Sequence, residues 1–319
     1  MRVRFLLAAC AATAACVVAE TADPDLVPGE ATLAVDGGNI WYKVSGAGAG
    51  TPLVLLHGGP GFSSFYLKPF EDLSDDRIVI RYDQLGSGKS DATTDTTRFT
   101  VEHFVRELDS LRAHLGIARW HVLGHSWGSM LAMAYYERHA PHVASLTLGS
   151  PVFKSTDFAA YARTLVTTLT DSSQRAIARA EAAGKFDDPS YQNAINEFYG
   201  LYVFRRPPAA DLDSSMTTFS QAVYGYMWGP SEFTMTGTLS TFDVLSRLPA
   251  VSVPTLLTVG EFDEVEPAAV QRAAGMIPGA EIVVLSGSAH ITTWDARDDN
   301  VRAVRAFLRR VDSATTRRY

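Results

Sequence analysis

The sequence predicts an open, mostly parallel α/β sheet interrupted by a helical insertion. Short apolar runs typical of buried strands alternate with longer helical patterns along most of the 319 residues. The alternation stops between residues 153 and 238, where only helical patterns continue. We therefore expect a core made of residues 31–152 and 239–311, with residues 153–238 forming a helical cap between its two parts.

Two kinds of strand are expected. ATLAVDG and NIWYKVSG are predicted to form an antiparallel hairpin with a turn at Gly37-Gly38. The later runs are nearly continuous in Val, Ile and Leu, as a parallel sheet covered by helices on both faces requires. They are LVLLHG, RIVIRYDQ, WHVLGHS, SLTLGSP, TLLTVGE and EIVVLSG. Ligands of such a sheet gather at the carboxyl ends of the strands.

Helices are expected in both the core and the cap. The core patterns are TVEHFVRELDSLRAHLG, SMLAMAYYERHAP and NVRAVRAFLRRV, and the cap patterns are STDFAAYARTLVTTL, DSSQRAIARAEAAG and SYQNAINEFYGLYV. The cap ends in the aromatic-rich VYGYMWGPSEF. Its aromatic residues are compatible with either a substrate pocket or the cap's own core. They include Phe198, Tyr199, Tyr202, Tyr224, Tyr226 and Trp228.

The amino terminus has the pattern of a targeting segment. Basic MRVR precedes the alanine-rich apolar run FLLAACAATAACVVA, which is short for a stable membrane span. We interpret residues 1–19 as a signal peptide for export, to the periplasm or outside the cell. Both cysteines, Cys10 and Cys16, lie in this segment, and Leu7-Ala8-Ala9-Cys10 leaves lipidation open. The alternative is a cytosolic protein with an apolar tail.

A candidate nucleophile lies between a strand and a helix. VLGHSWGSM contains Gly124-x-Ser126-x-Gly128 in the strand-turn-helix context of a nucleophile elbow. Small residues two positions either side of the serine permit a tight turn that projects its hydroxyl from the sheet.

A serine needs a base and an acid, expected in the order Ser, Asp/Glu, His. Asp263 follows the strand TLLTVGE and His290 follows EIVVLSG, so both are expected near Ser126. Glu261, Glu264 and Glu266 remain competitors for the acid role. Five further histidines are expected to be surface or capping residues: His103, His114, His121, His139 and His142.

The stretch HGGPG, residues 57–61, is a candidate oxyanion loop. Acyl transfer requires two backbone N–H groups directed at the developing oxyanion. We assign them to Gly59 and Trp127, because glycines allow close approach and Trp127 directly follows the nucleophile. His57 is expected to organise this loop, with a role as second base as the alternative. DQLGSGKS lacks P-loop spacing, so a structural role is expected for Asp83.

Five ordered motifs resemble the proline iminopeptidase family of α/β-hydrolases. They are HGGPG (57–61), DQLGSGKS (83–90), GHSWGS (124–129), GPSEFTMTG (229–237) and GEFDEV (260–265). The resemblance extends from about Leu33 to Leu308. It implies the α/β-hydrolase fold with a helical cap and a serine peptidase that releases an N-terminal residue, often proline. Some members with these motifs are amino-acid amidases. The family's nucleophile, acid and base fall on Ser126, Asp263 and His290.

The resemblance also implies two substrate-binding acids. In the family, two acidic side chains bind the free α-amino group of the substrate, and these positions fall on Glu232 and Glu264. A free amine with a reference pKa of roughly 7.7–8.0 is charged at neutral pH, and burying that charge is costly unless carboxylates pair with it. The alternative for Glu232 is a helix-cap or surface acid.

We therefore predict a serine hydrolase that forms an acyl-enzyme with a small peptide or amino-acid amide bearing a free N-terminus. An esterase or lactonase would use the same triad without Glu232 and Glu264. A non-catalytic binding protein of this fold would normally lack a triad member, whereas all three are present. No cluster has metal-ligand spacing, so neither a metal nor another cofactor is expected. The net charge of −7, without a Lys/Arg cluster, argues against a nucleic-acid partner.

Overall fold

The computed structural model describes residues 26–207 and 210–316. The expected signal peptide, residues 1–19, lies outside these ranges, as do Cys10 and Cys16. Within the described ranges, no helix is long and apolar enough to cross a membrane.

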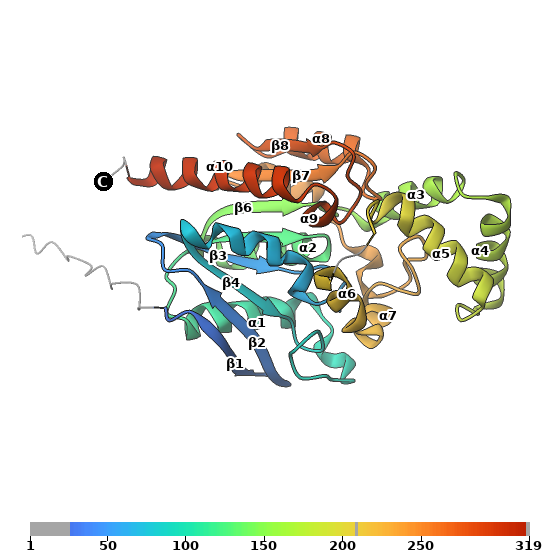
Figure 1. Cartoon of the computed structure of the whole chain (residues 1–319), viewed down its shortest axis with the longest axis horizontal. Helices are drawn as coiled ribbons and strands as arrows, with labels where there is room; N and C mark the ends of the chain where they lie inside the picture. The colour runs from blue at the N-terminus through green and yellow to red at the C-terminus, as the bar shows by residue number, and fades with distance from the viewer. Residues whose placement is uncertain (1–25, 208–209, 317–319) are drawn as a thin grey trace, which may run out of the picture.

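An eight-stranded sheet forms the core, in the order β1-β2-β4-β3-β5-β6-β7-β8. β1 and β2 form an antiparallel hairpin, β2 pairs antiparallel with β4, and all further pairs are parallel (Figure 1). The strands are β1 Gly29–Val35, β2 Gly38–Ser45, β3 Gly50–Leu56, β4 Arg77–Asp83, β5 Trp120–His125, β6 Val143–Gly149, β7 Thr255–Gly260 and β8 Glu281–Leu285. The predicted hairpin and parallel strands are confirmed, but the hairpin turn lies at Asp36-Gly37 rather than Gly37-Gly38, because Gly38 pairs with Val35 as the first residue of β2.

Helices cover the sheet. α1 and α2 pack against each other, and α10 packs against the 3₁₀ segment η1. The core helices are α1 Val101–His114, α2 Trp127–His139, α8 Pro267–Met276, α9 Thr292–Asp295 and α10 Arg297–Thr316. The 3₁₀ segments are η1 Ser64–Asp75, η2 Thr96–Arg98, η3 Ala140–His142, η4 Thr238–Thr241 and η5 Leu245–Ala250. The predicted α1, α2 and α10 are confirmed, whereas η1 contains Pro69 and has no helical pattern that would have predicted it.

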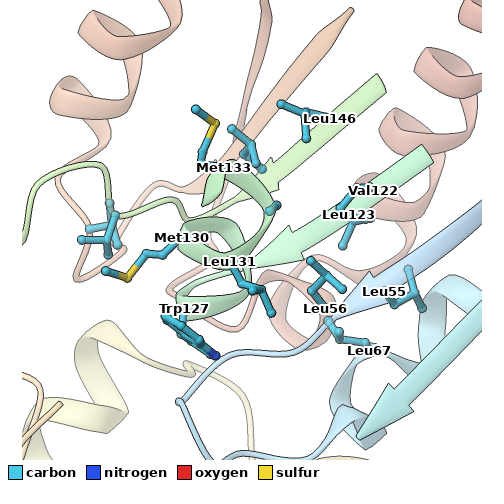
Figure 2. Close-up of a cluster of buried hydrophobic side chains, with 14 of the residues drawn as sticks. Leu55, Leu56, Leu67, Val122, Leu123, Trp127, Met130, Leu131, Met133 and Leu146 are labelled. Carbon is cyan, nitrogen blue, oxygen red and sulfur yellow. The ribbon is translucent and has the colours of Figure 1, made fainter. Parts of the chain in front are cut away.

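Helix α2 is the rigid support of the candidate nucleophile. Every residue from Trp127 to Tyr136 is buried, because the sheet and the neighbouring helices enclose the helix. Figure 2 shows Leu131 of α2 close to Leu56 of β3, and both side chains are fully buried. Truncating one such buried leucine typically costs about 2–5 kcal/mol, so the packing holds the amino end of α2 firmly at the end of β5.

Among the described residues, five helices lie between β6 and β7 in the chain and extend to one side of the sheet (Figure 1). They are α3 Ser155–Val166, α4 Asp171–Ala183, α5 Pro189–Tyr202, α6 Ala210–Thr217 and α7 Gln221–Met227. The end of α5 is joined to the core, because the N–H groups of His290 and Ile291 donate to the carbonyls of Tyr202 (3.1 Å) and Val203 (2.7 Å). The cap is thereby fixed against the loop that carries His290.

Candidate active site

Ser126 occupies a strained turn between β5 and α2. Its φ of 56° and ψ of −123° lie in a region that costs a non-glycine residue about 1–3 kcal/mol. The flanking glycines are required sterically, since a Cβ on Gly124 or Gly128 would come within 2.1 Å of the carbonyl oxygen of Gly128 or Leu56, respectively. The Ser126 N–H donates to the Gly149 carbonyl at 2.9 Å. This bond and the packing of α2 hold the turn in place.

His290 and Asp263 form a buried pair. His290 Nδ1 lies 2.8 Å from Asp263 Oδ1, which also accepts from the Val265 N–H at 2.9 Å. Asp263 Oδ2 accepts from the Ser150 hydroxyl at 2.6 Å and the Gly260 N–H at 3.2 Å. Burial favours the neutral acid, but His290 and the hydrogen bonds outweigh it and lower the pKa of Asp263. Asp263 is therefore an ionised acceptor that fixes the Nδ1–H tautomer of His290.

None of the three competing acids is hydrogen-bonded to His290 Nδ1, although Glu264 Oε1 lies 3.6 Å from His290 Nε2. Glu261 accepts hydrogen bonds from Ser286 and the Gly287 N–H at the surface, and Glu266 pairs with Arg272. Asp263 is thus the acid that is hydrogen-bonded to His290 Nδ1.

The HGGPG loop lies against the nucleophile. A Cβ on Gly58 would lie 3.0 Å from the Ser126 Cβ, and Gly59 has a φ of +106° that favours glycine. Among the described residues, the N–H groups of Gly59 and Trp127 have no hydrogen-bond acceptor, so both are available to a ligand. The geometry is compatible with the predicted oxyanion hole.

His57 and the DQLGSGKS motif hold this loop. His57 is fully buried; its Nδ1 lies 3.0 Å from the Gly58 carbonyl and its Nε2 accepts from the Gln84 N–H at 2.9 Å. The Gln84 side chain joins the His57 carbonyl (3.0 Å) to the Trp127 indole N–H (2.8 Å). Both ring nitrogens of His57 are engaged, which fits an organising role. Asp83 accepts from the Ser64 N–H and hydroxyl and from the Lys89 N–H, which fits the structural role expected for it.

One cavity of about 130 Å³ joins these groups. Ser126, His290, Gly59, Glu232 and Glu264 all line it. The rest of its wall is mostly aromatic and aliphatic, formed by Phe62, Tyr66, Tyr199, Val203, Phe204, Leu212, Met216, Phe219, Tyr224 and Ile291, together with Gly58 and His125. The cavity combines a serine, an imidazole and two carboxyl groups within an apolar wall.

The two glutamates are close enough to affect one another. Glu264 is 2% exposed; its Oε1 lies 3.6 Å from His290 Nε2, and its Oε2 has no hydrogen-bond partner among the described residues. Burial, then the charges of Glu232 and Asp263, raise the pKa of Glu264 well above its usual value. Burial also raises the pKa of Glu232, although the Tyr224 hydroxyl donates to it at 2.6 Å. The cavity therefore disfavours two adjacent negative charges unless a cation accompanies them.

The structure shows which of the six cap aromatics line the cavity and which do not, a question that the sequence left open. Tyr199 and Tyr224 line the cavity beside Glu232, whereas Phe198 is buried against Phe233 and Trp228 packs on Phe158. Tyr202 and Tyr226 do not line the cavity. Only two of the six thus contribute to the candidate site.

The structure corrects the expected exposure of two histidines and adds two residues to the candidate site. His103 and His121 are 2% and 1% exposed, so the expectation that they are surface or capping residues is wrong. His125 and Tyr66 line the cavity but were not predicted as site residues. The position of His125 next to Ser126 was a usable signal, whereas Tyr66 lies in η1 and had none. No group of three or more His, Cys, Asp or Glu side chains in residues 26–207 and 210–316 is arranged to hold a metal ion.

Comparisons with known proteins agree with this geometry. A family model described as the alpha/beta hydrolase fold matches residues 51–296. A proline iminopeptidase of Saccharolobus solfataricus is 35% identical over 280 residues, covering 86% of this chain and 90% of that protein. The crystal structure of a Mycobacterium smegmatis proline iminopeptidase has a TM-score of 0.82 and 33% identity, covering 90% of this chain and 100% of its own. That of VinJ has a TM-score of 0.85 and 29% identity, covering 89% and 100%. The chain therefore belongs to the proline iminopeptidase family of α/β-hydrolase-fold proteins.

Proposed function

We propose that this protein is a serine aminopeptidase or amino-acid amidase that binds the free amino group of its substrate between Glu232 and Glu264. The observation that carries the proposal is the pair of carboxyl groups in the cavity that also holds Ser126 and His290. An α-ammonium group supplies the positive charge that this pair lacks, and Glu264 Oε2 is a buried acceptor without a partner among the described residues.

The proposed reaction uses the groups in a defined order. His290 Nε2 takes the Ser126 proton as Oγ attacks the carbonyl carbon, while Asp263 holds the Nδ1–H. The N–H groups of Gly59 and Trp127 stabilise the oxyanion. His290 then gives its proton to the leaving amine, the C–N bond breaks, and water hydrolyses the acyl-enzyme by the same route.

The cavity also limits the substrate. The cavity, of about 130 Å³, is bounded on several sides by buried side chains around Ser126 and the two glutamates. The aromatic and aliphatic wall favours an apolar side chain or ring. An acylated amine carries no charge for Glu232 and Glu264, so we propose a small peptide or amino-acid amide with a free N-terminus as substrate.

The test compares free and N-acetylated aminoacyl-nitroanilides, together with a small neutral ester. Glu232→Gln leaves the ammonium partly unpaired, at a cost of roughly 2–5 kcal/mol, and should lower kcat/KM for the free aminoacyl substrate by about 30- to 3,000-fold. Hydrolysis of the ester should hardly change. Glu261→Gln is the matched control, because Glu261 is exposed and does not line the cavity.

Two results would contradict the proposal. The first is a parent enzyme that cleaves free and N-acetylated substrates at similar rates, which would favour the esterase hypothesis. The second is an equal loss of aminoacyl and ester hydrolysis in Glu232→Gln, which would indicate that Glu232 acts on the cavity as a whole.

A further inference from the structure

A buried chain of hydrogen bonds connects the candidate oxyanion loop to the loop that carries His290. The Gly58 N–H donates to the Tyr66 hydroxyl at 2.8 Å. The Tyr66 hydroxyl lies 2.9 Å from His125 Nδ1, and His125 Nε2 lies 2.9 Å from the His290 carbonyl oxygen. Tyr66 and His125 are 3% and 2% exposed. Three separate segments are thereby joined at the wall of the cavity, which Gly58, Tyr66, His125 and His290 all line.

The direction of each bond follows from the chemistry of the groups. A carbonyl oxygen can only accept, so His125 Nε2 carries the proton. A neutral imidazole then has an acceptor at Nδ1, and the Tyr66 O–H donates to it while its oxygen accepts from the Gly58 N–H. Each donor in the chain meets one acceptor, and no other tautomer of His125 satisfies all three contacts.

The chain keeps one protonation pattern across the working pH range of a hydrolase. Burial, then the charge of His290, lowers the pKa of His125 to about 3. Burial likewise raises the pKa of Tyr66 above its usual value, although the Gly58 N–H opposes this. Neither group is therefore poised to exchange a proton near neutral pH, which excludes a role as a second acid or base and leaves a geometric role.

The chain is also anchored from the side of the cap. The Tyr66 N–H donates to the hydroxyl of Ser215 at 2.9 Å, and Ser215 is fully buried on α6. The Tyr66 ring packs edge-on against His125, with ring centroids 5.3 Å apart, and the His125 and His290 rings lie 4.9 Å apart. Movement of Tyr66 or His125 would consequently shift the oxyanion loop and the base relative to each other.

We propose that Tyr66 and His125 are positioning residues that hold the oxyanion loop and the His290 loop at the separation that acyl transfer requires. The inference rests on the proposed function only in taking Ser126 and His290 as the reacting groups. Tyr66 and His125 line the cavity, but neither forms a hydrogen bond or ion pair with Glu232 or Glu264, so loss of the Tyr66 hydroxyl should affect the transition state more than binding of the amino group. A displacement of about 1 Å can cost a reaction about 10²-fold.

Tyr66→Phe is the principal test. It removes the hydroxyl, keeps the ring, and leaves the Gly58 N–H and His125 Nδ1 unpaired. We expect kcat to fall by about 10- to 100-fold with KM within about threefold of the parent. Affinity for the boronic acid analogue of the substrate that the parent cleaves best, which forms a tetrahedral adduct with Ser126, should fall by a similar factor. Affinity for the acid product of that substrate should be unchanged.

Tyr135→Phe is the matched control. It also removes a hydroxyl from a buried tyrosine, one that donates to Asp109 at 3.1 Å on α1, away from the cavity. It should lose stability without losing kcat. All assays use whichever substrate class the parent cleaves best, amide or ester, so a failure of the aminopeptidase proposal would leave this test valid.

A second pair of variants keeps the test decisive if Tyr66→Phe does not fold. His125→Gln retains an N–H that can reach the His290 carbonyl, whereas His125→Phe retains neither polar atom, so His125→Gln should keep at least about tenfold more kcat. Adding Tyr66→Phe to His125→Phe should cost less than about threefold more, because the chain is already broken. Three results would overturn the proposal. The first is a double variant in which the two kcat losses multiply. The others are a Tyr66→Phe variant with the parent's kcat, and one that loses product affinity and boronate affinity equally.

Discussion

Two Ser-His-Asp arrangements lie at opposite ends of the same sheet, and only one has the surroundings that acyl transfer needs. At the carboxyl ends of the strands, Ser126, His290 and Asp263 meet beside the cavity. At the amino ends, the Ser145 hydroxyl lies 2.7 Å from His121 Nδ1, and His121 Nε2 lies 3.1 Å from Asp312 Oδ1. In the second arrangement Ser145 is fully buried, and it does not line the surface hollow that His121 and Asp312 share.

The difference shows that three residue types in contact do not make a nucleophile. Ser145 and His121 are paired neighbours on β6 and β5, so the strands present the serine to its neighbour rather than to a substrate. Ser126 instead has a strained φ of 56° that releases its hydroxyl from the sheet, and the N–H groups of Gly59 and Trp127 have no acceptor within the described part of the chain. Accessibility and oxyanion donors, and not the triad contacts alone, separate chemistry from anchoring.

The largest expected difference between the two arrangements is in activity. Ser126→Ala should lower kcat by about 10⁴- to 10⁶-fold with the protein still folded, because the nucleophile is lost. Ser145→Ala should leave kcat within about twofold of the parent. It should instead lower the free energy of unfolding by about 1–3 kcal/mol, because buried His121 Nδ1 loses its partner. Steady-state kinetics and urea denaturation of both variants provide the measurement.

The opposite pattern of results would contradict the assignment of Ser126 as the nucleophile. Activity that survives Ser126→Ala, or that is lost in a folded Ser145→Ala variant, would move the chemistry to the amino ends of the strands.

A smaller effect is expected from the two aspartates. Asp263→Asn permits the wrong tautomer of His290 and should lower kcat by about 10²- to 10⁴-fold. Asp312→Asn should leave kcat unchanged but destabilise the fold, because Asp312 also pairs with buried Arg77 at 3.0 Å. Turnover and thermal unfolding of both variants separate the roles, and similar kcat values for the two would contradict the distinction drawn between the sites.

Sequence reasoning identified the part of the site that depends on strand ends. Ser126, Asp263 and His290 each follow a strongly apolar strand, and parallel strands bring their carboxyl ends together. The glycines of the elbow were also predictable, because the 2.1 Å approaches leave no space for a side chain at Gly124 or Gly128. Local pattern and sheet geometry were sufficient for these residues.

The remaining features depend on contacts that no local pattern encodes. Tyr66 reaches His125 only because η1, β5 and the His290 loop meet in space. Glu232 was suggested by family resemblance alone, and its cavity partner Tyr224 could not be distinguished from the cap's core by composition. His121 resembled a surface histidine, although pairing with Ser145 and Asp312 permits its burial. Each of these depends on residues more than 20 positions apart or on cap packing.

The smallest expected effect concerns the pH dependence of stability at the amino-end arrangement. Burial lowers the pKa of His121 in the folded protein, although Asp312 opposes this, whereas an unfolded histidine titrates near about 6.5. Below that pH the unfolded chain binds a proton that the folded protein does not, so the stability contribution of His121 is present above about pH 6.5 and is lost as the pH falls towards the folded pKa.

Between pH 7.5 and 5.5, we expect the parent to lose up to about 1 kcal/mol more free energy of unfolding than His121→Gln. His114→Gln, which removes an exposed imidazole, should follow the parent, and all three should have similar kcat at pH 7.5. Urea denaturation at both pH values tests this prediction. Equal losses of unfolding free energy in the parent and in His121→Gln would show that His121 is not held neutral between Ser145 and Asp312. A fall in kcat in His121→Gln would show that the two ends of the sheet are coupled rather than independent.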